Sequence, residues 1–251
     1  MFPGRSSSKP TTNNQILAAK NMQLPKLLLK DGTIEALKWL ALVLMVLDHT
    51  NKYVFAEKLP YIFEAGRIVM PLFVFVLAYN LARPGALKHG VYIRTIKRLG
   101  LFGILATPAF IGLGGLVSSW WPLNIMFALL VMTTTICLLD SHTIGGNIVA
   151  GIVFIIGGSS VEFWWPSIAI GVAVWSYCKT PSLHSIFIAI AALAALRVIN
   201  GNDWALAVIP IAVLSCFVTV PMPRFQWAFY IFYPLHLSVL LAITKTGITA
   251  S

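Results

Sequence analysis

Long apolar stretches, separated only by short polar connections, fill most of this 251-residue chain after position 30. Hydrophobic residues make up 58% of the chain and charged residues only 10%. A water-soluble chain of this length needs far more charge to cover its surface, so a lipid bilayer is the expected solvent. Only helices and closed barrels satisfy all backbone hydrogen bonds in a bilayer. The apolar stretches therefore predict an all-α, polytopic membrane bundle.

We expect about nine membrane-spanning helices, within a range of eight to ten. The fifth and sixth are the weakest and could instead form one hairpin that does not fully cross. Because the connections are short, residues 31–251 are expected to form a single domain. Residues 1–30 are polar and basic and are expected to form a flexible cytoplasmic arm. The expected spans are 34–49, 66–82, 92–113, 122–139, 144–158, 164–177, 183–199, 204–220 and 227–243.

The net charge of +10 has two interpretations, namely nucleic-acid binding and membrane topology. In so apolar a chain the second is favoured, because lysine and arginine gather on the cytoplasmic side of membrane proteins. The 18 lysines and arginines divide thirteen to five between the two sides of the nine-span scheme. This bias predicts a cytoplasmic N-terminus, an external C-terminus and no nucleic-acid partner.

The first expected span ends in the pair Asp48-His49, and Lys38 lies eleven residues earlier. Eleven residues are almost a whole number of helical turns, so Lys38 and His49 share one face, about 16 Å apart along the axis. Glu35 lies near the same stripe. Ionisable groups within a membrane helix usually face a wet cavity or the bundle interior, and histidine accepts protons near neutral pH. The pair therefore indicates a catalytic centre, and the alternative is that it merely caps the span at the interface.

Further polar residues follow in the next spans. Arg67 begins the return span on the same side as His49. It could pair with Asp48 or Glu64, or hold an oxyanion or carboxylate; the alternative is a snorkelling arginine. The amide of Asn80 could bridge helices. The basic residues Arg94, Lys97 and Arg98 could bind phosphate groups, or they could simply keep their segment in the cytoplasm.

Three polar residues stand out later in the chain, namely Asn124 at the start of the fourth span and Tyr233 and His236 in the last. A histidine inside a span indicates function by default, although it can also serve as a hydrogen-bond partner between helices. No pair of histidines has metal-ligand spacing on one helix, and the three cysteines show no paired spacing. The sequence therefore predicts no metal site.

Together these residues resemble the TraX family of conjugal-transfer pilin acetylases. The resemblance lies in the spacing of Lys38 and His49 and in Ala-Gly-Arg67 with Pro71 and Asn80-Leu-Ala-Arg83. Asn124-Ile-Met-Phe-Ala and Tyr233-x-x-His236 continue the pattern in the same order. A basic residue, a ten-residue gap and a histidine are also similar to a wider class of membrane acetyltransferases that modify sugars. The resemblance is dense over residues 35–83 and thin afterwards.

The resemblance implies acetylation of the N-terminal amine of a conjugative pilin in the bacterial inner membrane, with acetyl-CoA as donor. His49 would be the general base and Asp48 would orient it. Acetyl-CoA is cytoplasmic, whereas His49 is expected near the external end of its span. The pantetheine arm of acetyl-CoA would therefore thread between helices to reach His49. The resemblance does not extend to the oligomeric state. From the resemblance, Arg67, Asn80 and Asn124 are implied as pocket residues and Lys38 as the cation of the motif. We expect substrate binding also at His236, Tyr233 and Glu35, and we hypothesise that the nucleotide of the donor docks near Lys38, Arg94, Lys97 and Arg98.

Two other functions remain open from the residues. The same histidine, carboxylate and cation set would suit head-to-tail cyclisation of a pilin or another terminal modification, since both are acyl transfers to an amine. A non-catalytic scaffold or transporter that handles pilin is the other alternative. Transporters often carry broken helices in symmetric positions of two halves, and the prolines of this chain show no such placement.

Overall fold

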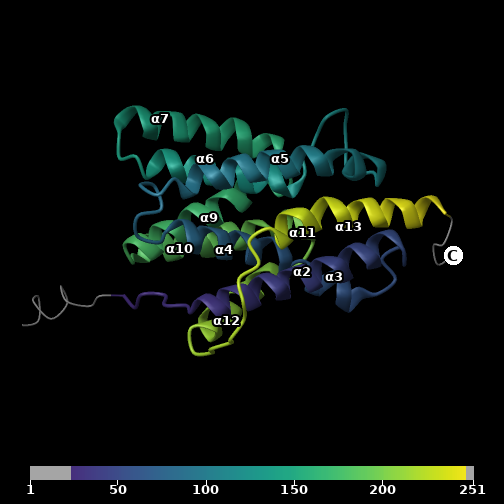
Figure 1. Ribbon diagram of the computed structural model, residues 1–251, viewed down its shortest axis with the longest axis horizontal. Helices are drawn as coiled ribbons and strands as arrows, with labels where there is room; N and C mark the ends of the chain where they lie inside the picture. The colour runs from purple at the N-terminus through teal and green to yellow at the C-terminus, as the bar shows by residue number, and fades with distance from the viewer. Residues whose placement is uncertain (1–23, 247–251) are drawn as a thin grey trace, which may run out of the picture.

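The computed structural model describes residues 24–246, and every regular element in that range is helical. The all-α prediction is therefore confirmed for the described part of the chain. Figure 1 shows most of the helices running along the long axis of the molecule. The elements are α2 (Asp31–Tyr53), α3 (Pro60–Gly66), α4 (Val69–Leu81), α5 (Val91–Gly112), α6 (Ile125–Leu139), α7 (Ile144–Ile152), a π-helix (Val153–Gly157), α8 (Gly158–Ser160), α9 (Trp164–Lys179), α10 (Leu183–Ala195), α11 (Arg197–Asn200), a 3-10 helix (Trp204–Ala207), α12 (Val208–Ser215) and α13 (Ala228–Lys245).

Most of these helices lie where the apolar stretches predicted them. Within the described residues, three helices are long and apolar enough to cross a membrane, namely 60–81, 183–200 and 228–245. Shorter apolar helices cover 125–139, 144–160 and 204–215. The number of crossings stays a prediction. One expected span differs clearly, because helix within 204–220 ends at Ser215.

Helix α4 occupies the centre of the bundle, where it packs against α2, α6 and α9. Its buried residues point in all directions around the helix, among them Leu72, Val74, Phe75 and Ala78. A helix that is apolar all round is stable only when other elements surround it. Close packing extends to its neighbours, because a Cβ atom on Gly171 of α9 would lie 1.9 Å from the sulfur of Met132 of α6.

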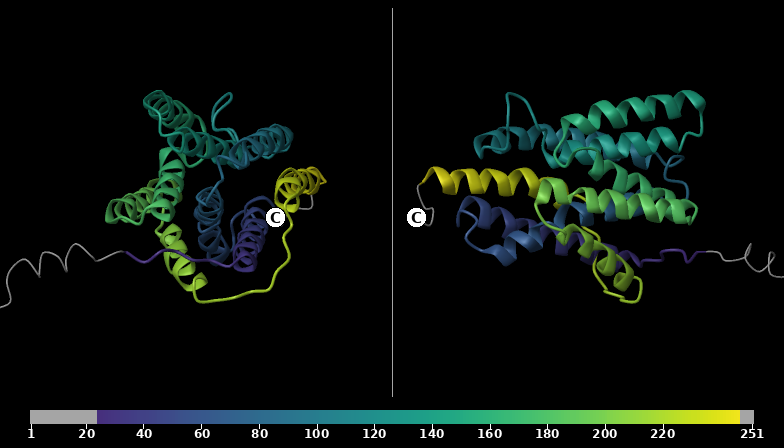
Figure 2. Two further views of the ribbon diagram at one scale, coloured as in Figure 1. Left: turned by 60° about the vertical axis from the view of Figure 1, so that its left-hand side comes forward. Right: turned by 180° about the vertical axis from the view of Figure 1, so that it is seen from behind.

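The chain after α12 leaves helical structure and runs along α2 before α13 begins, as the left view of Figure 2 shows. Thr33 donates its hydroxyl to the carbonyl of Val218 at 2.8 Å. The N–H of Phe225 donates to Glu35 Oε1 at 2.9 Å. Gly32 permits this approach, since a Cβ there would lie 2.0 Å from the Val220 carbonyl oxygen. These contacts explain why the expected span 204–220 is cut short: its last residues bind α2 instead.

The predicted arm, residues 1–30, falls mostly outside the described residues. Its described part, 24–30, is extended and contacts two helices. The N–H of Leu29 donates to the hydroxyl of Tyr79 on α4 at 2.9 Å, and the Tyr177 hydroxyl of α9 donates to the Pro25 carbonyl at 2.6 Å. The last residues before α2 are therefore held against the bundle.

Large apolar side chains cover the outer faces of several helices. Ile144 on α7 is 83% exposed, Phe187 on α10 is 72% exposed and Val198 on α11 is 84% exposed. Soluble proteins rarely expose contiguous apolar surface of this kind, whereas lipid tails cover it without cost. The surface thus supports association with a membrane.

Candidate functional site

Two cavities lie end to end inside the bundle. The first, of about 480 Å³, contains most of the cations of the site, and we call it the basic cavity. The second, of about 370 Å³, contains Asp48 and His49, and we call it the histidine cavity. Met45, Ile125 and Tyr233 line both. The wall between the cavities is therefore only a few side chains thick.

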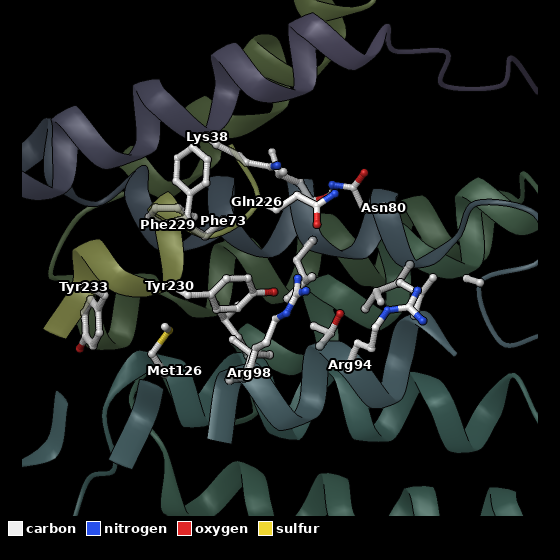
Figure 3. Close-up of a pocket in the computed structure, with 18 of the residues that line it drawn as sticks. Lys38, Phe73, Asn80, Arg94, Arg98, Met126, Gln226, Phe229, Tyr230 and Tyr233 are labelled. Atoms are coloured by element: carbon white, nitrogen blue, oxygen red, sulfur yellow. Dashed lines mark hydrogen bonds between the residues drawn. The ribbon is translucent and has the colours of Figure 1, made fainter. Parts of the chain in front are cut away.

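The basic cavity is lined by α2, α4, α5, α6 and α13, together with the connections before α5 and α13. Figure 3 shows Arg94 and Arg98 of α5 reaching toward Lys38, Asn80 and Gln226 from the opposite side. Asn80 lines the cavity, and its amide nitrogen donates to the carbonyl of Val76 on its own helix. The other basic residues that line it are Arg83, His89 and Arg224.

The cations of the basic cavity differ in how they are neutralised. Lys38 pairs with the buried Glu35 at 2.8 Å, and Arg83 pairs with Asp31. Among the described residues, no carboxylate lies within ion-pair distance of Arg94, Arg98 or Arg224. The Arg98 guanidinium instead stacks 4.3 Å from the Trp227 ring. Guanidinium groups without a carboxylate partner are well suited to bind phosphate.

The histidine cavity is built around a pair of histidines from opposite ends of the chain. His49 of α2 lies with its Nδ1 2.7 Å from Nε2 of His236 of α13. The two rings are nearly parallel, with centroids 4.9 Å apart. His236 is buried behind His49, and its own Nδ1 lies 2.9 Å from the carbonyl oxygen of Tyr233. His49 lines the cavity, whereas His236 supports it from behind.

The hydrogen-bond chain fixes the tautomers of both rings when they are neutral. A carbonyl oxygen only accepts, so Nδ1 of His236 carries the proton and its Nε2 must accept. Nδ1 of His49 then donates to His236, and Nε2 of His49 keeps its lone pair. This assignment follows from the network of heavy-atom distances. The arrangement makes Nε2 of His49 a proton acceptor.

Asp48 pairs with Arg67 at 2.8 Å, as one of the alternatives from the sequence predicted. His49 donates to Nε2 of His236 and not, as expected, to Asp48, because the Asp48 carboxylate faces Arg67 at the end of α3. Arg67 also donates to the Phe63 carbonyl and stacks 4.2 Å from the Phe63 ring. Gly66 makes room for the pair, since a Cβ there would lie 2.2 Å from Asp48 Oδ1.

Glu162 is a residue of the histidine cavity that the motif analysis did not single out. It lies in the connection between α8 and α9. Burial raises its pKa to about 7, while Lys52 and a hydrogen bond from the backbone of Ile125 lower it. The one signal in the sequence was an acidic residue inside an otherwise apolar connection. The following residues, Phe163 and Trp164, have φ angles of 62° and 48°, a left-handed conformation that costs bulky residues roughly 1–3 kcal/mol each.

The predicted site residues either line a cavity, stand behind a lining residue, or lie away from both cavities. Lys38, Asn80, Arg94, Arg98 and Tyr233 line the basic cavity, and Asp48, His49, Arg67 and Tyr233 line the histidine cavity. Glu35 and His236 stand directly behind lining residues. Lys97 and Asn124 line neither cavity. Asn124 caps α6 by accepting from the Met126 N–H and donates to the Gly103 carbonyl of α5.

Fold and site define the class: a helical protein with an apolar exterior, in which a cavity next to a pair of histidines adjoins a second cavity lined by arginines. The comparisons with known proteins are specific. The model of the family described as TraX protein matches residues 33–244. The chain belongs to the TraX family. It is 30% identical over 253 residues to Protein TraX of Escherichia coli, covering 92% of this chain and 95% of that protein.

A second relative, Protein TraX of Escherichia coli strain K12, is 31% identical over 126 residues, which cover 50% of this chain and 48% of that protein. No solved structure matches this chain. Both cavities and the paired histidines lie within the segment that the family model matches, because Lys38 and His236 fall inside residues 33–244.

Proposed function

We propose that this TraX family protein transfers an acetyl group from acetyl-CoA to the N-terminal amine of a conjugative pilin. The observation that carries the proposal is the placement of a proton acceptor next to a cavity of unpaired guanidinium groups. His49 lines one cavity and Arg94 and Arg98 line the other, and Tyr233 borders both. An acyl-CoA has the matching form, with phosphates at one end and a thioester at the other.

The basic cavity would bind the nucleotide end of acetyl-CoA. Arg94, Arg98 and Arg224 would contact phosphate oxygens, because charge-assisted bonds to guanidinium groups are short and strong. The aromatic rings of Phe229 and Tyr230 lie on the same wall and could pack against an adenine base, as Figure 3 shows. Head-to-tail cyclisation needs no nucleotide donor, so this cavity favours acetylation over cyclisation.

The pantetheine arm would pass between Met45, Ile125 and Tyr233 and bring the thioester to His49. Lys38 and His49 mark the two ends of this path on α2, about 16 Å apart at a rise of about 1.5 Å per residue. An extended arm suits the distance. The path would also connect a donor that enters from the cytoplasm with His49, which is expected near the external end of its span.

His49 Nε2 would take a proton from the acceptor amine as the amine attacks the thioester carbonyl. His236 would hold the ring of His49 in the tautomer that leaves this nitrogen free, and it would share the positive charge that develops. The role assigned to Asp48 therefore changes: paired with Arg67, it would shape the wall of the cavity. The bond from the amine to the acetyl carbon forms, the bond to sulfur breaks, and the thiolate is protonated by the imidazolium.

The proposal places the protein in the bacterial inner membrane as a multi-pass protein with a cytoplasmic N-terminus and with conjugative pilin and lipid as its partners. The apolar outer faces of α7, α10 and α11 support this location. In vitro turnover of acetyl-CoA with a pilin peptide tests the function. We expect acetylated peptide from the wild-type protein and none from His49→Ala. Equal product from both would remove His49 from the mechanism.

A further inference from the structure

Glu162 is the carboxylate of the histidine cavity that lacks an ion-pair partner. The chain has eight aspartates and glutamates, all within the described range. Glu57 and Glu64 are also unpaired among the described residues, but they line neither cavity. The five that form ion pairs are Asp31, Glu35, Asp48, Asp140 and Asp203. An unpaired carboxylate inside an apolar bundle is expensive, so its cavity must offer it a positive ligand or a proton.

The loop around Glu162 is held firmly to the start of α6. The N–H of Leu123 donates to the Ser160 carbonyl, and the N–H of Glu162 donates to the Leu123 carbonyl, both at 2.9 Å. The left-handed conformation of Phe163 then turns the chain sharply into α9. These bonds fix the main chain of Glu162, and its carboxylate accepts a hydrogen bond from the backbone of Ile125, so the group is held in place as a binding residue requires.

The charges around Glu162 leave it available. Lys52 lines the same cavity and its charge lowers the pKa of Glu162, but no ion pair joins the two. The Lys52 side chain is exposed, with its ammonium 5.3 Å from the ring of Tyr53. Asp48 and Arg67 neutralise each other. The remaining polar groups on the wall are the His49 ring, the phenols of Tyr53 and Tyr233 and the indoles of Trp121 and Trp164. Glu162 is therefore the carboxylate on this wall that forms no ion pair and can receive an added positive charge.

We propose that Glu162 is the acceptor-recognition residue of this site, which binds the N-terminal ammonium group of the acceptor and takes its first proton. The inference rests on the proposed function, because it assigns the acceptor end of the same reaction. It makes the site selective for an amine over a hydroxyl group, since a neutral hydroxyl brings no charge to an unpaired carboxylate.

The proton balance of the reaction gives such a group a role. An ammonium has no lone pair, so it must lose one proton before it attacks and a second as the new bond to carbon forms. The first proton moves to the carboxylate of Glu162 and the second to Nε2 of His49. The thiolate then takes the proton of His49, and Glu162 releases its proton to water. The overall products are the acetylated amine, free coenzyme A and one proton.

The pKa values of Glu162 and of the acceptor amine are close to each other. The pKa of Glu162 is raised to about 7 by burial, and an unperturbed α-amino group has a pKa of about 7.7–8.0. Proton transfer from ammonium to Glu162 is therefore only slightly uphill. A carboxylate with an ordinary pKa would bind the ammonium but leave it protonated.

Two peptides test the assignment. Both carry the mature N-terminal sequence of a conjugative pilin, and one has hydrogen in place of its α-amino group. Binding is measured on purified protein in detergent at pH 7.5. We expect the wild type to prefer the amine peptide by about tenfold to a hundredfold, the range for hydrogen bonds to charged groups. Glu162→Gln should lose this preference while its KM for acetyl-CoA stays unchanged.

Glu64→Gln is the matched control, because Glu64 is also unpaired and lies outside both cavities. It should keep the wild-type preference. An unchanged preference in Glu162→Gln would overturn the inference. If that variant does not fold, the wild type alone decides, since equal binding of the two peptides overturns the inference as well. If the wild type fails to acetylate the amine peptide yet still prefers it, the proposed function fails and the assignment of Glu162 to amine binding stands.

Discussion

His49 and His236 are 187 residues apart in sequence, yet their rings stack in parallel with Nδ1 of the first 2.7 Å from Nε2 of the second. The bond joins α2 to α13, the first and last helices of the described chain. It leaves one nitrogen of His49 facing a cavity and buries the other against a partner. The first and last described helices thus meet at the ring whose other nitrogen, Nε2, would accept the proton.

Removing the supporting histidine should impair catalysis more than binding. In His236→Ala, the ring of His49 loses the acceptor that fixes its tautomer, so kcat should fall by about a hundredfold or more, in line with the usual contribution of general-base catalysis. KM for acetyl-CoA should change little, because His236 lines neither cavity. Steady-state kinetics with a pilin peptide measures both constants.

The control is His236→Gln, whose amide oxygen can accept from His49 and should restore part of the activity. A variant with full kcat would show that His236 is only a packing residue.

Charge in the basic cavity should govern donor affinity. Arg98→Ala removes a guanidinium that has no carboxylate partner in the described structure, and KM for acetyl-CoA should rise about tenfold. Titration with acetyl-CoA at fixed peptide gives the constant. Lys88→Ala removes an equal charge from the neighbouring connection without lining the cavity, so its KM should stay near the wild-type value. An equal rise in both variants would mean that overall charge, rather than this cavity, attracts the donor.

Gly66 should be intolerant of a larger side chain. A Cβ at this position would lie 2.2 Å from Asp48 Oδ1 and 2.7 Å from Asp48 Cβ, so Gly66→Ala must push Asp48 away from Arg67. We expect a loss of about 1–3 kcal/mol of stability, as for other overpacked sites. Thermal unfolding in detergent measures it. Gly151→Ala in α7 meets open space and should be neutral or slightly stabilising. Equal Tm values for the wild type and Gly66→Ala would contradict the close approach of α3 to α2.

Glu162 should make the protein less stable as the pH rises. Its folded pKa, raised to about 7 from an ordinary value of 4.5, means that the unfolded chain loses its proton first. The stability that the neutral group contributes is fully present below pH 4.5 and is lost as the pH rises through 7. Glu162→Gln should flatten this part of the profile of Tm against pH. The Glu64→Gln profile should follow the wild type. A wild-type profile that rises between these pH values and is unchanged in Glu162→Gln would contradict the assignment.

Hydrophobic periodicity and charge predicted much of the fold, and they predicted the residues that α2 and α5 contribute to the site. The helical spacing of Lys38 and His49 correctly placed both on the face of α2 that lines the cavities. Arg94 and Arg98 are four residues apart and share a face of α5, whereas Lys97 lies roughly 100° around the helix from Arg98. Helical periodicity therefore turns Lys97 away from the basic cavity. The prediction that Lys97 binds the donor was based on its charge alone.

The contacts that site residues make with residues far away in the chain could not be predicted from the sequence. Nothing local to Asp48-His49 indicates that His236 would reach His49 first and that Asp48 would turn toward Arg67. Asn124 looked like a pocket residue, because a polar residue at the start of a span has the same appearance whether it caps a helix or binds a ligand. Glu162 depends on a loop whose position is set by backbone bonds to Leu123, which no residue pattern encodes.

The most direct test of acetyl transfer is the intact mass of a conjugative pilin co-expressed with this protein. With the wild type, mature pilin should gain the mass of one acetyl group on its N-terminal amine. With His49→Ala it should retain the unmodified mass. Loss of one water in the presence of the wild type would indicate cyclisation instead, and identical pilin masses with wild type and His49→Ala would contradict the catalytic role of His49.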